Sequence, residues 1–588
     1  MFYRLKKKYI EIITRISIKD HTFLIVFAGL VGLGSGFGAV GFKWLINFFH
    51  NAIFIKGHDL LGISPGLHQI LLPLLPMAGG LLVGPLSYFF PTEAKGHGVP
   101  EVMESVALKS GVIKPRTVGL RALASAMSIG SGGSAGREGP IVQIGSAIGS
   151  TIGQILRVSG ERIKILVGCG AAGGIAATFN APIAGVLFSL EIILGDFNVR
   201  TFSPIVISSV IATATARAIE GDVPSFVVPS YELISHWEIL FYIILGIFCG
   251  LVARLYVKTL YWFEDFFEER VNIPTILKPA LGGLMLGIIG IFLPQIFGNG
   301  YEAMGDALNS RMIWYMAFVL IFIKILATSI TLGSGGSGGI FAPSLFIGAM
   351  MGGTFGALIH SIFPAITAPK GAYALVGMGS VVAAAAHAPM TAILILFELT
   401  NDYEIILPIM VSCIVSTFIA RRLSLESIYT VKLNRKGIAI NQGRDVNIMN
   451  SILVKDVMVD KVDTIPENTH FKELLEIVTR SKHFYFPVVD KRGLMTGILS
   501  FQDIRGMIFE HGLYNLLVAK ELATENVVTV FPDNNLTEAL EKFTSKGIEQ
   551  LPVVNKENPG QVIGMLRRGD VINAYNQAVI KQSMERER

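Results

Sequence analysis

The chain has 588 residues, of which 51% are hydrophobic and only 16% are charged, and its formal net charge is +5. A composition this apolar is typical of an integral membrane protein and argues against a soluble enzyme, and so small a net charge does not argue for nucleic-acid binding. The three cysteines, Cys169, Cys249 and Cys413, all lie in apolar runs. They indicate membrane packing and not a disulfide or zinc framework.

Residues 1–21 are basic, and the apolar run that begins at Thr22 is too long for a signal peptide. We interpret this run as a first membrane helix with a cytoplasmic N-terminus, because lysine and arginine favour that side. In the first half we expect apolar segments at 22–50, 68–90, 116–130, 141–157, 163–194 and 203–219. In the second half we expect them at 237–265, 275–297, 313–331, 344–363, 372–400 and 404–420. A polar loop at about 220–235 joins the halves.

Residues 130–140 read Gly-Ser-Gly-Gly-Ser-Ala-Gly-Arg-Glu-Gly-Pro between two apolar segments. A glycine-rich break at membrane depth is tolerated only where it is buried in protein or lines a cavity. The final Gly-Pro predicts a helix N-terminus, whose unpaired N–H groups bind anions. Glu138 places a carboxylate there, where it can compete with a permeating anion. The alternative is a structural carboxylate paired with Arg137.

The same pattern returns 203 positions later, at residues 333–343. A second pair follows: Asn-Ala-Pro at 180–182 through Glu191 matches His-Ala-Pro at 387–389 through Glu398. Two motifs in one order indicate an internal duplication, and such repeats in transporters place the substrate site at the repeat interface. We expect Glu191 and Glu398 to be equivalent and structural, with a functional role as the alternative.

After the Arg421-Arg422 pair the chain becomes basic and then soluble in character, so this end is also expected to be cytoplasmic. A second duplication follows, in which residues 483–490 match 547–555 and residues 497–503 match 564–570. Each copy alternates short strands with amphipathic helices, which predicts α/β structure.

Three stretches, at 136–140 (Gly-Arg-Glu-Gly-Pro), 338–343 (Gly-Gly-Ile-Phe-Ala-Pro) and 96–101 (Gly-His-Gly-Val-Pro-Glu), resemble the signatures of the CLC chloride channels and chloride/proton exchangers. The C-terminal copies are similar to a pair of CBS domains. The resemblance covers residues 20–578 and implies an α-helical polytopic membrane protein of two inverted repeats with tilted, broken helices, followed by an α/β CBS pair. The implied parts are a basic N-terminus (1–21), repeat 1 (22–219), a connecting loop (220–235), repeat 2 (236–430), a linker (431–452), and CBS domains at 453–511 and 516–578.

The resemblance further implies chloride transport through one pore in each subunit of a homodimer, in the plasma membrane or cell inner membrane, with no enzymatic activity and no nucleic-acid partner. Glu138 would be the gating glutamate, and Tyr429 sits where the family has its pore tyrosine. The residues implied to bind the anion are His97, Gly339, Ile340, Phe341 and Tyr429.

Two positions depart from the family pattern. His97 replaces the usual serine; imidazole can donate to an anion but is larger and titrates near neutrality, and a mere packing role is its alternative. Ile192 stands immediately after Glu191, where exchangers usually carry a proton-relay glutamate.

Because an isoleucine cannot carry a proton, we predict a passive voltage- or pH-gated channel regulated by the CBS pair. The alternative is a chloride/proton antiporter that uses Glu138 and either His97 or water. A CBS-regulated cation transporter is disfavoured, since duplicated helix N-termini suit anions.

Ser500 and Asp503 match the Ser/Thr-x-x-Asp pattern with which CBS domains contact a nucleotide ribose. The second copy has Arg567 in place of the hydroxyl residue but retains Asp570. Adenine-nucleotide binding at these residues and a purely structural or dimerising role both stay open. No cofactor is required for transport.

Overall fold

The structure is a computed structural model that describes residues 20–62, 67–222, 228–229, 231–400, 402–436, 438, 452–460, 462–481, 484–505, 507, 514 and 516–584. It divides into two units, Met1–Asp445 and Val446–Arg588. The basic N-terminal segment lies almost entirely outside the described residues, as do much of the predicted linker and part of the predicted connecting loop.

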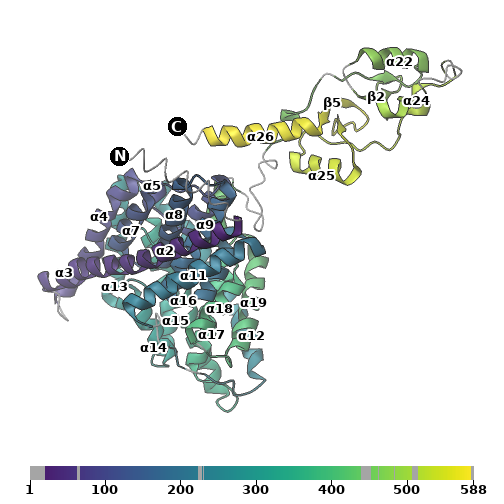
Figure 1. The fold of residues 1–588 in the computed structure, drawn as a ribbon. Helices are drawn as coiled ribbons and strands as arrows, with labels where there is room; N and C mark the ends of the chain where they lie inside the picture. Colours follow the sequence, from purple (N-terminus) through teal and green to yellow (C-terminus); the bar gives the residue numbers. More distant parts are fainter. Residues whose placement is uncertain are drawn as a thin grey trace, which may run out of the picture. The chain divides into compact units, whose positions relative to one another are not determined.

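The membrane unit is helical, and its helices pack at varied tilts (Figure 1). Its first half contains α2 (Asp20–Phe49), η1 (His50–Ile55), α3 (Lys56–Leu60), η2 (Leu67–Leu71), α4 (Leu74–Phe89), α5 (Pro91–Ala94), α6 (Val99–Leu108), α7 (Thr117–Gly130), α8 (Glu138–Ile155), α9 (Gly160–Phe179), α10 (Pro182–Phe188), η3 (Ser189–Leu194) and α11 (Val199–Glu220).

Its second half contains α12 (Glu238–Asp265), η4 (Phe266–Arg270), η5 (Thr275–Leu277), α13 (Lys278–Phe292), η6 (Pro294–Ile296), α14 (Tyr301–Leu308), α15 (Trp314–Gly333), α16 (Phe341–Ile362), α17 (Lys370–Ala386), α18 (Pro389–Thr400), α19 (Ile406–Leu423) and α20 (Thr430–Arg435). Within the described residues, nine helices are long and apolar enough to cross a membrane.

Two predicted segments, 163–194 and 372–400, are each broken into two helices. Asn180 and His387 adopt left-handed backbone angles, with φ of 60° and 56°, and they end α9 and α17. A proline, which is favoured in the first turn of a helix, then begins α10 and α18. The two breaks agree with the tilted, broken helices that were expected, although the sequence did not locate them. The short helices α6 and α14 were not predicted at all.

The two halves cross at α4 and α13 through matched glycines 203 positions apart. A Cβ atom on Gly80 would lie 2.2 Å from the Pro279 carbonyl oxygen, and one on Gly283 would lie 2.2 Å from the Pro76 carbonyl oxygen. Each helix thus contacts the other through equivalent positions of the two repeats. This reciprocity is what a pseudo-two-fold axis between the repeats requires. Glycine is needed because it lets the two backbones approach this closely.

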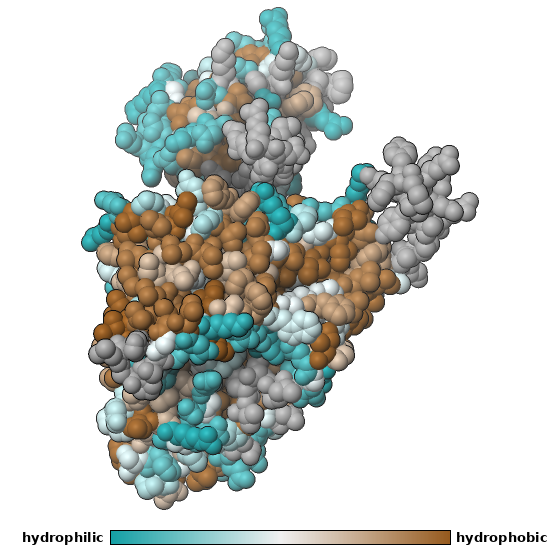
Figure 2. Space-filling view, turned by 90° about the vertical axis from the view of Figure 1, so that its left-hand side faces the viewer, coloured by the Kyte–Doolittle hydropathy of each residue, from teal (hydrophilic) through white to brown (hydrophobic). Residues whose placement is uncertain are grey.

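Figure 2 shows a wide apolar area on one face of the membrane unit. Exposed large apolar side chains occur along several of its helices, including Phe37 and Trp44 on α2, Val210 on α11 and Ile414 on α19. A surface of this kind is favourable against lipid or another subunit and unfavourable against water. The chain is therefore an integral membrane protein, as its composition predicted.

The C-terminal unit holds two similar α/β copies. The first contains η7 (Val454–Asp456), β1 (Ile465–Pro466), α22 (Phe471–Arg480), β2 (Tyr485–Val489), β3 (Met495–Ser500) and α23 (Phe501–Arg505). The second contains α24 (Ala519–Leu522), α25 (Leu536–Lys546), β4 (Gln550–Val554), β5 (Val562–Arg567) and α26 (Arg568–Met584). Strand β1 pairs in parallel with β2, and the hairpins β2–β3 and β4–β5 are antiparallel.

The first segment of each copy packs in the core of the other copy. Val454 of η7, at the start of the first copy, packs in the core of the second with Phe543, and Ala519 of α24, at the start of the second copy, packs in the core of the first with Phe471. Each core is therefore completed by the other copy, which makes the pair one folding unit.

We predict that Gly80→Val and Gly283→Val each lower the free energy of unfolding by about 3 kcal/mol, because the added side chain collides with backbone. Thermal unfolding in detergent measures the effect. Gly41→Val is the matched control, since a Cβ there meets nothing within 4 Å. Equal melting temperatures for all three variants would contradict the crossing geometry.

Candidate functional site

Glycine-rich loops from both repeats meet in the centre of the membrane unit. The backbone N–H of Gly136 donates to the Gly339 carbonyl oxygen at 2.7 Å, and the N–H of Gly339 donates to the Gly136 oxygen at 2.6 Å. A Cβ atom on Gly139 would lie 2.0 Å from the His97 oxygen and 3.0 Å from Gly339 Cα. The N-termini of α6, α8 and α16 therefore converge, and their unpaired N–H groups favour an anion.

Glu138 is the first residue of α8 and is only 1% exposed. Its Oε2 accepts a hydrogen bond from the backbone N–H of Ala342 at 3.3 Å, in the first turn of α16. Its Oε1 accepts one from the Tyr301 hydroxyl at 2.7 Å. The carboxylate thus occupies the helix N-terminus of the opposite repeat, where an anion would be favoured.

Arg137, the alternative partner of Glu138 in the sequence, lies at the same loop. Its guanidinium carbon stands 5.4 Å from the centre of the Tyr301 ring, and its Nη2 donates to the Thr178 carbonyl oxygen at 3.3 Å. The arginine therefore contributes a positive charge beside the glutamate while it also holds the end of α9.

The residues predicted to bind the anion are all nearly fully buried in or beside these loops. His97 is 3% exposed, and its Nδ1 makes no hydrogen bond with any described residue. Ile340 precedes α16, and Phe341 begins it. Tyr429 directly precedes α20 and lies near enough to Glu138 for an electrostatic interaction.

A network of buried charges holds the loop around His97, and the sequence analysis did not predict it. Arg121 is fully buried and donates to the carbonyl oxygens of Ala94 (3.2 Å) and Gly96 (2.7 Å). Glu101 accepts from the Gly98 N–H at 2.9 Å and pairs with Lys432 of α20 at 2.8 Å. These contacts tie the helix that follows Tyr429 to the loop that carries His97.

The second repeat has a counterpart of this arrangement. Lys324, 203 positions after Arg121, is fully buried and donates to the carbonyl oxygens of Ile296 (2.9 Å) and Gly298 (3.0 Å). The loop that it holds leads into α14 and Tyr301, which sequence reasoning missed as a contact of Glu138. Alignment of the repeats could have revealed the role of Lys324, since it places a basic residue before the Gly-Ser-Gly loop in both repeats.

Glu191 and Glu398 make reciprocal contacts across the repeats. Glu191 accepts hydrogen bonds from the N–H groups of Met390 (3.2 Å) and Thr391 (2.7 Å) at the start of α18. Glu398 accepts from those of Ile183 (2.8 Å) and Ala184 (2.6 Å) at the start of α10. Each carboxylate therefore caps a helix of the other repeat, which is a structural role. Ile192, next to Glu191, is buried.

In the C-terminal unit, the Ser500 hydroxyl donates to Asp503 Oδ2 at 2.7 Å, and the Ser500 N–H donates to the same atom at 2.8 Å. This pair caps α23 locally, as the structural alternative expected. Asp570 lies in the first turn of α26, and its buried Oδ2 has no hydrogen-bond partner in the described part of the chain. The structure therefore does not bring the three residues into one contact network.

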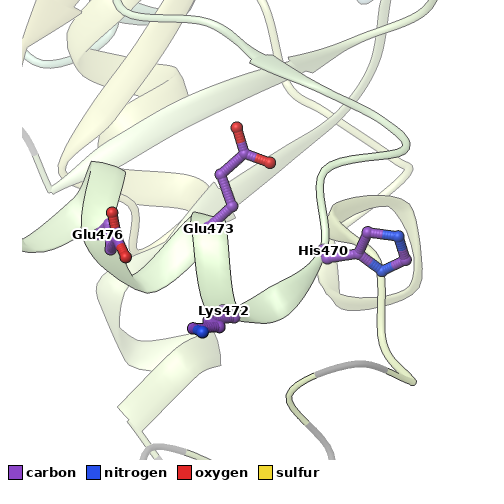
Figure 3. Close-up of a pocket in the computed structure, with 4 residues that line it drawn as sticks. All are labelled: His470, Lys472, Glu473 and Glu476. Carbon is purple, nitrogen blue, oxygen red and sulfur yellow. The ribbon is translucent and has the colours of Figure 1, made fainter.

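The C-terminal unit also has a surface hollow of about 500 Å³, lined by His470, Lys472, Glu473 and Glu476 at the start of α22. Figure 3 shows these four side chains pointing in different directions. None of them is a predicted nucleotide contact, and their mixed charges do not favour a nucleotide phosphate.

Comparisons with known proteins fit this geometry. A family model described as voltage gated chloride channel matches residues 79–421, and the CBS domain model matches residues 454–510 and 519–577. The putative chloride channel protein ClcB-like of Ralstonia nicotianae is 34% identical over 416 residues, which cover 70% of this chain and 97% of that protein. The chloride channel protein CLC-f of Arabidopsis thaliana is 28% identical over 622 residues, covering 92% of this chain and 78% of that protein.

A solved structure of a slow cyanobacterial Cl⁻/H⁺ antiporter is also similar, with a TM-score of 0.66 and 30% sequence identity. The match covers 71% of this chain and 99% of the antiporter chain. The similar proteins therefore include some named as channels and several named as chloride/proton exchange transporters or antiporters.

We predict that Glu398→Ala lowers the free energy of unfolding by about 1 kcal/mol, because two N–H groups of α10 lose their acceptor. Glu404→Ala is the control, since that glutamate is exposed. Thermal unfolding in detergent compares the two. Lost transport with an unchanged melting temperature would instead give Glu398 a role in the transport step.

Proposed function

The chain belongs to the voltage-gated chloride channel, or CLC, family, and from this premise we propose that it is a passive chloride channel gated by Glu138. Anion transport across a membrane is the activity of this family, and its members are transporters and channels, not enzymes. What is proposed beyond the family is the passive mechanism, the residues that carry it and its regulation by the CBS pair.

One observation carries the gate proposal: the Glu138 carboxylate accepts the Ala342 N–H at the N-terminus of α16. A chloride ion would use the same N–H group, so the ionised carboxylate and the anion exclude each other. Protonation removes the negative charge, and outward rotation removes the side chain. Either event leaves the helix N-terminus open to chloride.

We assign the anion seat to His97, Gly339, Ile340, Phe341 and Tyr429. The N–H groups of Ile340 and Phe341 lie at the start of α16, where the helix dipole adds a partial positive charge. His97 supports the assignment because its buried Nδ1 lacks a partner among the described residues. A neutral imidazole can place a donor on that atom and give it to an anion.

The passive mechanism rests on the region around Glu191. Its carboxylate accepts hydrogen bonds from N–H groups at the start of α18, and the adjacent Ile192 is buried and apolar. A proton crossing a low-dielectric region needs titratable groups or connected water, and Ile192 supplies neither.

Proton-coupled exchange is the second candidate. It is favoured by the 30% identity to the cyanobacterial antiporter and by the buried position of His97, a titratable group at the anion seat. In that mechanism Glu138 would take the proton on one side and His97, or water, would pass it on.

We also propose that two subunits form a homodimer with both termini in the cytoplasm, in the plasma membrane or cell inner membrane. The exposed apolar residues Phe202 and Val210 of α11, with Ile414 and Phe418 of α19, supply a surface that a second subunit can cover. For the CBS pair we propose an adenine nucleotide as ligand, with Ser500, Asp503 and Asp570 contacting the ribose.

We predict that Glu138→Ala and Glu138→Gln raise chloride efflux from liposomes several-fold at neutral pH and remove its dependence on pH, because neither side chain competes as an anion. Glu302→Gln is the control, since that glutamate is exposed on neighbouring α14. Wild-type efflux and pH dependence in both Glu138 variants would rule out the gate.

We predict that the reversal potential of the purified protein in bilayers follows the chloride gradient alone, because no inner proton relay stands at Ile192. Proton uptake driven uphill by a chloride gradient would support exchange instead. In that event, loss of the uptake in His97→Ser would identify the histidine as the proton route, and its persistence would indicate water.

A further inference from the structure

The hydrogen bond from the Tyr301 hydroxyl to Glu138 Oε1 is part of neither the anion seat nor the helix N-terminus. It spans 163 positions and joins a residue of repeat 2 to the gate of repeat 1. Tyr301 begins α14, and its ring also faces the Arg137 guanidinium at 5.4 Å. The gate glutamate is therefore held by two separate donors, one on each carboxylate oxygen.

The loop before Tyr301 is fixed in place. Gly300 has a φ of 77°, and a Cβ there would lie 2.5 Å from the Phe346 ring. Lys324 donates to the carbonyl oxygens of Ile296 and Gly298 at 2.9 Å and 3.0 Å. Its ammonium group also stands 4.9 Å from the centre of the Phe346 ring. The lysine and the phenylalanine together determine where α14 begins, and so where the tyrosine points.

The two donors of Glu138 differ in what happens when the gate opens. The Ala342 N–H can exchange the carboxylate for chloride, so its hydrogen bond is replaced. The Tyr301 hydroxyl loses its charged acceptor when Glu138 is protonated or rotates away. A hydroxyl that donates to an ionised carboxylate forms a short, charge-assisted bond that is stronger than a neutral one. The tyrosine bond therefore favours the closed, ionised state specifically.

We propose that Tyr301 is a latch that holds ionised Glu138 across the anion pathway, and that Lys324 is a positioning residue for this latch. The proposal rests on Glu138 being the gate and adds a residue that sets the pH at which the gate opens.

Chloride efflux from liposomes, measured as a function of pH, tests the latch. In Tyr301→Phe the pH of half-maximal efflux should rise by about one unit, which corresponds to a tenfold easier protonation, because ionised Glu138 loses one donor. In the Glu138→Ala background the same substitution should have no effect, since no carboxylate remains to be held.

Tyr231→Phe is the matched control. Its hydroxyl donates to the Leu308 carbonyl oxygen at the other end of α14, so the variant loosens the same helix without touching Glu138. It should keep the wild-type pH of half-maximal efflux. An equal shift in Tyr231→Phe would trace the effect to α14 stability and overturn the latch.

Lys324 is tested by two variants. Lys324→Met should shift the pH of half-maximal efflux in the same direction as Tyr301→Phe, and the double variant should shift no further. Lys324→Arg should keep the wild-type profile, because Arg121 holds the equivalent carbonyl pair in repeat 1 with a guanidinium. A shift in Lys324→Met that adds to that of Tyr301→Phe would overturn the positioning role.

The outcomes also separate the latch from the gate. A wild-type pH profile in Tyr301→Phe together with a lost pH dependence in Glu138→Ala would overturn the latch and keep the gate. A wild-type profile in Glu138→Ala would overturn both.

Discussion

The whole membrane unit depends on one constraint: helices that end inside the bilayer must still satisfy their backbone groups. Each repeat alone would leave a glycine loop and several helix N-termini unpaired in an apolar medium. The two repeats satisfy each other, through the paired N–H and carbonyl groups of Gly136 and Gly339 and through the reciprocal caps of Glu191 and Glu398. At the start of α16, the Ala342 N–H is satisfied by a side chain, Glu138. The proposed gate lies at this point, because a chloride ion could take the place of the carboxylate on that N–H group.

Duplication explains the architecture, and divergence between the copies explains why the two sides of Glu138 differ. Arg121 and Lys324 both hold the carbonyls of a loop that leads into a short helix. In repeat 1 that loop contributes the buried imidazole of His97, whereas in repeat 2 it leads to the hydroxyl of Tyr301. The scaffold around the glutamate is therefore nearly symmetric, while the side chains that it presents, an imidazole in repeat 1 and a phenol in repeat 2, differ.

The sequence predicted those parts of the molecule that local patterns control. Glycine loops, apolar runs and a fixed offset gave the repeats, the position of Glu138 and the CBS pair. Broken helices were expected, but the breaks were not located at Asn180 and His387, because both residues lie within long apolar runs. The bond between Tyr301 and Glu138 could not be predicted from either residue alone, since it depends on how one repeat docks on the other. Only alignment of the two copies pointed towards Lys324.

The contacts around Ile192 bear on whether a neighbouring group could carry a proton in its place. The neighbouring Glu191 is the nearest carboxylate along the chain, but both of its oxygens already accept hydrogen bonds from α18. To carry a proton it would have to release a helix N-terminus on which the repeat interface depends, a cost that a dedicated relay residue does not bear. His97 differs from Glu191 in that its Nδ1 has no hydrogen-bond partner among the described residues, although its ring packs edge-on against Tyr261. In the proposed exchange mechanism the proton would therefore pass through His97 or through water and not through Glu191. On the histidine route, proton and anion would compete for one side chain.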